Sequence, residues 1–442
     1  MAPSTPRPSA FRRLRCLNCQ KERPLDAVGV CPDCGGPVES EYDLDPRALP
    51  AHPDRADGIW AYAAALPPVD PRWRVTLGEG ATPYLPLPRL ARSIGIAALR
   101  GKWEGTNPTG SFKDRAAALG VSLARSLAYR GVFAASSGNA AAAIAACSAR
   151  AGLPCLILAR DDMTEEKLRQ LTAYGPEIVR VRGLFDSRAT LERGLAAVGR
   201  RRPGWRNLFV WSPWNPLLTD ALRTIAFEIA SEGEIPDAVA VPVAGGDILR
   251  GIYLGFEELR RAGAIRRVPK FIAAQSNLAA PTVRELSGEG GGLWPDADRT
   301  LAGALRVGFP SPHAVEAVRA SGGWGVAVPD RESVRWQARL ARDEGIFCEV
   351  SSAVALAAVA RSRADGRLRS DDRVAVVLTG AGYKDYTVPV GARPAAVLPA
   401  ARLDRLSRRG GARRGPLPGA RAPPRARPRR ESASSRVGRE TE

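Results

Sequence analysis

The chain has 442 residues, 45% of them hydrophobic, so it can bury a large core and divide into two or more domains. The formal net charge is +19, and residues 391–442 contribute +10 of it through fourteen Arg against four acidic residues. No apolar run is long enough to span a membrane, and the N-terminal residues lack the apolar segment of a signal peptide. We therefore expect a cytoplasmic protein with no membrane partner.

The segment 391–442 is rich in Pro, Gly, Arg and Ala and has few large apolar side chains. Such a composition cannot bury enough surface to offset the entropy of ordering, so we expect a disordered basic tail. Contacts of this tail with RNA or acidic partners would be non-specific. A solvated tail without a dedicated role is the simpler interpretation, and we expect no specific nucleic-acid partner.

Four of the seven cysteines form two C-x2-C pairs, Cys16 with Cys19 and Cys31 with Cys34. Two such pairs supply four thiolates for one tetrahedral ion, which predicts a structural Zn²⁺ in a small ribbon over residues 1–45. Because all four positions are thiolates, no coordination position is open for water, so we do not expect a catalytic metal. Disulfides are the alternative, which a chain without a secretion signal disfavours.

Beyond residue 130, short apolar segments alternate with helical patterns. Strands are predicted at 131–135, 154–159, 178–181, 208–211, 238–243, 271–275 and 374–378. This alternation predicts an α/β fold with a largely parallel sheet. Polar loops follow three of these strands, at the carboxyl edge where ligands of such sheets bind.

The stretch 107–115, Asn-Pro-Thr-Gly-Ser-Phe-Lys-Asp-Arg, runs from a turn into an alanine-rich helix and places Lys113 near the helix N-terminus. The positive end of the helix dipole favours the neutral amine, which is the form that attacks an aldehyde. We interpret Lys113 as the residue that binds a cofactor aldehyde covalently. The alternative is an exposed lysine in a helix cap.

Taken together, these segments resemble threonine synthase, a family of fold type II pyridoxal-phosphate enzymes, over about residues 14–388. Residues 107–115 match the lysine motif of that family letter for letter. The resemblance implies two three-layer α/β/α domains with mainly parallel sheets, similar to the tryptophan synthase β subunit. The larger, cofactor-binding domain would comprise 46–112 and 215–390, and the smaller domain 113–214.

The resemblance also implies roles for individual residues. Lys113 would hold pyridoxal 5′-phosphate and move protons at the substrate's α and β carbons. Asn139 would bond the pyridoxal 3′ oxygen, and Thr379 would meet the ring nitrogen. The cofactor phosphate would lie at a loop made of Gly245, Gly246, Asp247 and Ile248. The substrate would be held by Ser136, Ser137, Gly138, Ala140 and Ser212.

Several positions depart from the family pattern and leave the substrate open. Ala140 replaces a hydroxyl residue, Trp211 replaces an asparagine, and the position of a phosphate-binding arginine is Leu217 or Leu218. Arg223 would compensate only if its helix were rotated. Asp247 brings negative charge towards a phosphate, which is unfavourable unless it points away.

Three functions remain open on these grounds. The first is conversion of O-phospho-L-homoserine and water to L-threonine and phosphate. The second is β-elimination or β-replacement on another amino acid, such as a serine or phosphoserine derivative. The third is a non-catalytic zinc-ribbon protein that binds nucleic acid through its tail. We expect a small amino-acid substrate, and a homodimer is left open.

Overall fold

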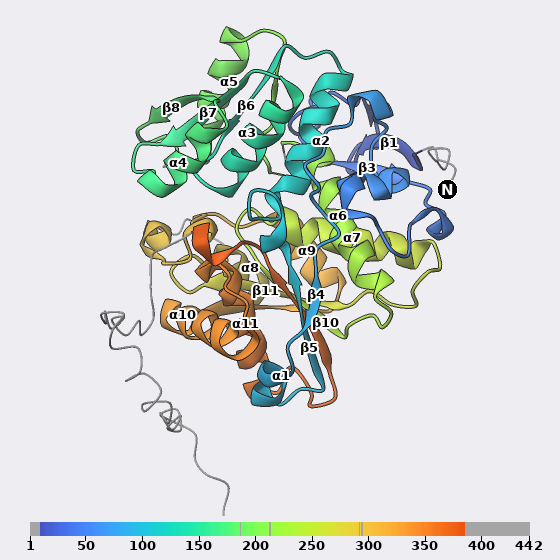
Figure 1. Ribbon diagram of the computed structural model, residues 1–442, viewed down its shortest axis with the longest axis vertical. Helices are drawn as coiled ribbons and strands as arrows, with labels where there is room; N and C mark the ends of the chain where they lie inside the picture. The colour runs from blue at the N-terminus through green and yellow to red at the C-terminus, as the bar shows by residue number, and fades with distance from the viewer. Residues whose placement is uncertain (1–8, 186, 212–213, 291, 293–294, 385–442) are drawn as a thin grey trace, which may run out of the picture. The chain divides into compact units, whose positions relative to one another are not determined.

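The computed structural model describes residues 9–185, 187–211, 214–290, 292 and 295–384. These residues form three β-sheets, and Figure 1 labels many of their strands and helices. The predicted tail 391–442 and Ser212 lie outside the described residues, and the predicted domain boundaries stay predictions. Within the described ranges, no helix is both long enough and apolar enough to cross a bilayer.

The largest sheet has six strands in the order β12-β11-β10-β13-β5-β4. Neighbouring strands are parallel, except that β4 pairs antiparallel with β5 at one edge. The strands are β4 (Tyr84–Pro86), β5 (Ala98–Trp103), β10 (Ala238–Pro242), β11 (Lys270–Ser276), β12 (Trp324–Val328) and β13 (Arg373–Leu378).

Helices cover both faces of this sheet, because successive side chains of a strand point to opposite faces. Val374, Val376 and Leu378 of β13 join one core cluster, whereas Ala375 and Val377 join another. The first cluster includes side chains of α1 (Pro88–Ile94), α10 (Asp330–Arg339) and α11 (Val350–Ala364). The second includes α6 (Pro216–Ser231), α7 (Asp247–Arg261) and α9 (Pro312–Ala320), and α8 (Pro281–Ser287) packs on β11 and β12.

A second sheet has four parallel strands in the order β8-β7-β6-β9. They are β6 (Gly131–Ala135), β7 (Cys155–Arg160), β8 (Glu177–Val181) and β9 (Trp205–Asn207). One face packs against α2 (Lys113–Ser126), α3 (Asn139–Ala151) and α4 (Glu165–Ala173), and the other against α5 (Arg188–Arg201). The predicted α/β fold with two three-layer, mainly parallel sheets is confirmed.

The strand predicted at 208–211 was wrong in position, since β9 lies three residues earlier. The Asn207 side chain accepts a hydrogen bond from the backbone N–H of Phe209 (2.8 Å), and Asn215 donates to the Phe209 carbonyl (2.8 Å). These local bonds compete with the sheet ladder and turn the chain away after Asn207. The apolar residues that suggested a strand pack into the core instead.

The N-terminal ribbon is a small antiparallel sheet, β2-β1-β3, made of β1 (Phe11–Cys16), β2 (Glu22–Arg23) and β3 (Val38–Tyr42). Strand β3 packs against α6. Ser40 Oγ and Tyr42 OH both donate to Asp220 Oδ2, at 2.5 and 2.9 Å. The ribbon is therefore part of the same buried structure as the six-stranded sheet.

Candidate active site

Lys113 is the first residue of α2 and is half-buried. Burial lowers the pKa of its amine below the ordinary value, and the carboxylate of Asp247 partly opposes this shift. No hydrogen bond or ion pair joins Lys113 Nζ to another residue in the part of the chain that the structure describes. Its amine lies 4.8 Å from the centroid of the Phe112 ring. Such surroundings favour a neutral, nucleophilic amine.

A continuous series of contacts connects the Lys113 segment with Thr379 and Asn139. The N–H of Phe112 donates to the Thr379 carbonyl (3.1 Å), and Ser111 forms a β-bridge with Gly380. Glu349 then receives two hydrogen bonds from Asn139 Nδ2 (3.0 and 3.2 Å), while its N–H donates to the Gly380 carbonyl (3.0 Å). The structure therefore brings Lys113, Thr379 and Asn139 together at the carboxyl ends of β13 and β6.

The Thr379 hydroxyl is held in place by Ser352. The two hydroxyl oxygens are 2.8 Å apart, and Ser352 Oγ also accepts from the N–H of Gly380 (3.0 Å). Thr379 is almost completely buried. Its side chain therefore has one orientation, as a fixed partner for a ligand atom requires.

Gly245 and Gly246 form the loop between β10 and α7, with Asp247 and Ile248 opening the helix. Gly246 has φ of +91°, and a Cβ there would lie 2.0 Å from Ser311 Oγ, so only glycine fits. No described side chain caps the N-terminus of α7. Its first backbone N–H groups and its dipole are therefore available to an anion, and the phosphate loop itself stays a prediction.

Ser136, Ser137 and Gly138 form the turn between β6 and α3. Ser136 Oγ accepts from the N–H groups of Gly138 (3.3 Å) and Ala141 (3.2 Å), and Ser137 Oγ accepts from the N–H of Arg160. A Cβ on Gly138 would meet open space. Ala140 lies in the first turn of α3, and among the described contacts none joins this turn to Lys113.

A buried ion cluster includes the first turn of α2, the helix that begins at Lys113. Arg115 is fully buried between Glu104 and Glu228, and its five N–H donors bond to those carboxylates and to Thr82 and Thr224. Lys102 donates to Glu228 as well. The cluster therefore contains two cations and two anions, whose charges balance. Arg115, its central residue, follows Lys113 by two positions.

The side chains at the positions that depart from the family pattern are either apolar or bonded to residues away from the candidate site. Leu217 and Leu218 are buried in the core, and Leu218 packs towards Gly120 of α2. Arg223 does not face the site: it pairs with Asp220 (2.9 Å) and lies 4.8 Å over the Tyr42 ring of the ribbon. The suggestion that Arg223 compensates for a missing phosphate ligand is therefore wrong.

Trp211 lies at the glycine loop. A Cβ on Gly245 would be 3.0 Å from Trp211 Cδ1 and 3.5 Å from its Nε1. The Trp211 ring also packs on Phe309, Phe209 and Trp214, with centroid distances of 5.3, 6.2 and 6.5 Å. An aromatic cluster thus borders the predicted phosphate loop.

Sequence reasoning missed Glu349. Its carboxylate lies against Gly380, where a Cβ would be 2.5 Å from Oε2, and it accepts from Asn139. The residue is 3% exposed and occupies the N-cap position of α11 without a capping hydrogen bond from its side chain. A carboxylate directly before a buried apolar helix was the available signal, because a buried acid needs partners.

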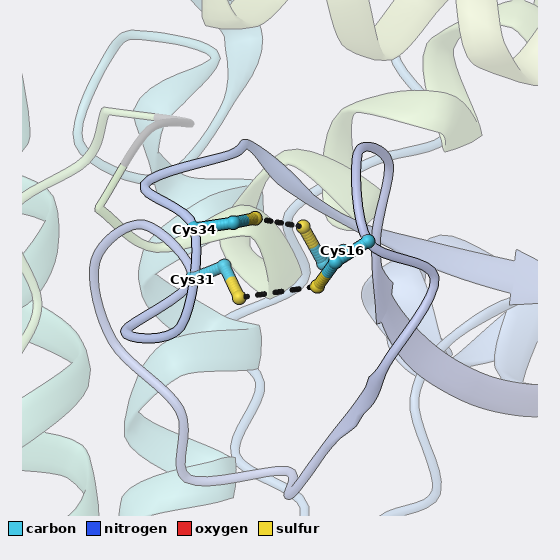
Figure 2. Close-up of side chains that lie close together, drawn as sticks. Cys16, Cys31 and Cys34 are labelled. Atoms are coloured by element: carbon cyan, nitrogen blue, oxygen red, sulfur yellow. Dashed lines mark hydrogen bonds between the residues drawn. The ribbon is translucent and has the colours of Figure 1, made fainter.

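The four N-terminal thiols form a compact group. Their sulfur atoms lie within 4.8 Å of one another, with Cys16 to Cys34 at 3.4 Å and Cys19 to Cys31 at 3.7 Å (Figure 2). These separations exceed a disulfide bond. Burial would raise the pKa of Cys31, but hydrogen bonds from the N–H groups of Asp33 and Cys34 lower it to about 6. The group suits a tetrahedral metal ion that prefers thiolates.

Comparison with known proteins identifies relatives of this arrangement. Residues 75–380 match the family model described as pyridoxal-phosphate dependent enzyme. Threonine synthase of Methanocaldococcus jannaschii is 35% identical over 381 residues, covering 84% of this chain and 92% of the relative. The Methanosarcina acetivorans threonine synthase is 33% identical with the same coverage. Maize serine racemase shares the fold, with a TM-score of 0.60 and 22% identity over 70% of this chain and 89% of the racemase.

Proposed function

Because the chain belongs to the threonine synthase family of pyridoxal-phosphate dependent enzymes, we propose that it converts O-phospho-L-homoserine and water to L-threonine and phosphate. The observation that carries the proposal is the placement of Lys113. A half-buried lysine with a lowered pKa begins α2 and connects through Thr379 and Glu349 to Asn139.

The residues present fit pyridoxal phosphate. Lys113 offers the amine, the uncapped N-terminus of α7 offers N–H groups for a phosphate, and Thr379 offers a fixed hydroxyl. Asp247 is the one unfavourable charge at this loop, and it also raises the pKa of Lys113. When bound, the cofactor supplies an electron sink for negative charge at the α carbon of an amino acid.

The chain's own side chains then bind, orient and move protons. Lys113 holds the cofactor covalently and afterwards transfers protons at the substrate's α and β carbons. Asn139, whose amide donates to Glu349 here, would hydrogen-bond the pyridoxal 3′ oxygen, and the turn at Ser136–Gly138 would hold the substrate carboxylate at the start of α3. Thr379 would meet the ring nitrogen with a hydroxyl rather than a carboxylate, which would leave that nitrogen uncharged and suit elimination and replacement over transamination.

A structural Zn²⁺ at Cys16, Cys19, Cys31 and Cys34 belongs to the same proposal. The four sulfur atoms occupy all four tetrahedral positions, so the ion would stabilise the ribbon and take no part in the reaction.

A second candidate is β-elimination or β-replacement on a different amino acid. It is favoured by the aromatic cluster at Gly245 and by the burial of Leu217 and Leu218, which leave no cation at those positions. A phosphate leaving group needs dense, charge-assisted contacts. An uncharged leaving group would suit Leu217 and Leu218 better, although the Arg188 guanidinium lies 5.0 Å over the Trp211 ring of the aromatic cluster.

The experiment has two stages. First, the purified protein is reduced with borohydride in the presence of pyridoxal phosphate, and the labelled peptide is identified by mass spectrometry. We expect label on Lys113, none in Lys113→Ala, and full label in Lys270→Met, a control at an exposed lysine. Equal labelling of wild type and Lys113→Ala would refute the enzyme proposal.

In the second stage, phosphate release is measured with O-phospho-L-homoserine, and pyruvate formation is measured with O-acetyl-L-serine, a serine derivative whose leaving group is uncharged in the substrate. Turnover of the first with formation of threonine supports the main proposal. Turnover of the serine derivative alone, or of neither, with Lys113 labelled, would replace it with the second candidate.

A further inference from the structure

Lys384 is a buried lysine that connects the two α/β parts of the fold. It is 9% exposed and ends the 3₁₀ turn η8 (Gly382–Lys384), which follows β13 of the six-stranded sheet. Its ammonium group donates to the carbonyl of Thr109 and to Gln170 Oε1 (2.9 Å). Gln170 belongs to α4, which covers the four-stranded sheet, and its Nε2 donates to the same Thr109 carbonyl (3.2 Å).

Thr109 also forms hydrogen bonds with Asp114, through its backbone N–H and its hydroxyl. Asp114 accepts from the Thr109 N–H (2.8 Å) and from the Thr109 hydroxyl (2.6 Å). Gly110 follows with φ of +87°, and a Cβ there would lie 2.9 Å from Lys384 Cδ and 3.0 Å from Tyr383 OH. The segment leading to Lys113 is thus clamped between Lys384 and Asp114.

Burying the ammonium group of Lys384 costs free energy that its surroundings only partly offset. Burial lowers the pKa of Lys384, the carboxylates of Glu349 and Asp114 oppose the shift, and the nearby ammonium of Lys167 adds to it. Within the described residues no carboxylate lies at ion-pair distance from Lys384, so two neutral oxygens are its hydrogen-bond partners. An apolar side chain would avoid the desolvation cost, so packing alone does not account for a lysine here.

We propose that Lys384 is a positioning residue that locks α4 to the Lys113 segment. One ammonium group fixes the Thr109 carbonyl and the Gln170 amide together, so the loop that leads to Lys113 keeps its place between α4 and the turn η8. The effect on catalysis rests on the proposed role of Lys113, whereas the lock between α4 and Thr109 does not.

The test compares Lys384→Met, Lys384→Arg, Gln170→Leu and the double variant Lys384→Met/Gln170→Leu with wild-type holoenzyme. Lys270→Met, an exposed lysine at the start of β11, is the matched control. Hydrogen exchange is measured for the amides of α4, and kcat and KM for phospho-homoserine turnover. We expect faster exchange in α4 and a kcat lowered about tenfold to hundredfold by Lys384→Met, with KM changed much less.

Lys384→Arg should restore part of the slow exchange in α4 and part of kcat. The double variant should have the same exchange rate and kcat as the single variants, because each single substitution already breaks the same contact. If Lys384→Met fails to fold, Gln170→Leu carries the same test with the lysine retained. The inference would be overturned if hydrogen exchange in α4 of Lys384→Met were as slow as in the control Lys270→Met. It would also be overturned if the effects of the two single substitutions added up in the double variant. If wild-type protein does not turn over phospho-homoserine but Lys384→Met still speeds hydrogen exchange in α4, the proposed substrate is refuted and the proposed contact between α4 and Thr109 is supported.

Discussion

At the scale of single residues, the state of Lys113 depends on two opposed influences. Burial lowers its pKa, while the carboxylate of Asp247 raises it. A group that must be neutral to react becomes reactive at lower pH as its pKa falls. In the proposed role of Lys113, Asp247 would therefore raise the pH at which the lysine takes up pyridoxal phosphate.

Removing the Asp247 charge should shift cofactor uptake to lower pH. In Asp247→Asn the raising influence is lost, so the pKa of Lys113 falls further and the neutral amine persists at lower pH. The measurement is the rate of appearance of visible absorbance when cofactor-stripped protein meets saturating pyridoxal phosphate across a pH series. Asp237→Asn, at the opposite end of β10, should keep the wild-type midpoint. An unchanged or higher midpoint in Asp247→Asn would contradict the electrostatic argument.

Lys113 and Thr379 could be predicted because their signals are local: a motif at a helix start and a polar turn after a buried strand. Glu349 could not be placed in this way. Its position depends on the bridge between Cys348 and Ala381 and on the approach of Asn139, 210 residues away in sequence. A carboxylate directly before an apolar helix shows that Glu349 needs a partner, but local composition does not identify a partner so distant in sequence.

At the scale of elements, the ion cluster couples α2, α6 and β5. Arg115 of α2 and Lys102 of β5 both bond to Glu228 of α6. Burial raises the pKa of Glu228, but the two cations outweigh burial and lower it to about 2. The carboxylate thus remains charged inside the protein throughout the neutral range.

Glu228→Gln should destabilise the protein by about 3 to 5 kcal/mol, because it leaves Arg115 and Lys102 partly uncompensated. The wild-type advantage is complete above the unfolded-state pKa of 4.5 and declines as the pH falls towards 2. Denaturant unfolding at neutral and acid pH measures both effects. Glu232→Gln, at the C-cap of the same helix but half-exposed beside Arg100, should cost less than about 1 kcal/mol. Equal losses in the two variants would show that burial does not govern the cluster.

The alternation of strands and helices predicted most elements, yet it misplaced the strand at 208–211. Apolar character marks burial and does not distinguish a strand from a packed loop. Here the Asn207 side chain decided the outcome by bonding to the following backbone. The aromatic residues that follow became a cluster beside Gly245.

At the scale of the whole chain, the ribbon is fixed to the helices that flank the candidate site. Beyond the bonds to Asp220, Arg250 of α7 pairs with Glu39, and the N–H of Gly29 donates to the Trp214 carbonyl (2.7 Å). The helix α7 begins at the predicted phosphate loop, so loosening the ribbon would disturb elements that carry the site.

Loss of the metal should therefore lower the stability of the entire protein. We expect a chelator to reduce the thermal midpoint of the wild type by several degrees, since metal binding stabilises only the folded ribbon. Cys31→Ser should show a similar reduction without chelator and no further response to it. Metal analysis and thermal unfolding provide the measurements. A wild-type midpoint that ignores the chelator would contradict the structural role of the thiol group.

The docking of β3 on α6 also orders events during synthesis. Ser40 and Asp220 are 180 residues apart, so the ribbon leaves the ribosome well before its partner helix exists. At typical translation speeds this interval is roughly 10 to 40 s. All four thiols and all three ribbon strands lie within the first 42 residues. The four ligands of the proposed Zn²⁺ are therefore all synthesised before α6, the helix on which β3 docks.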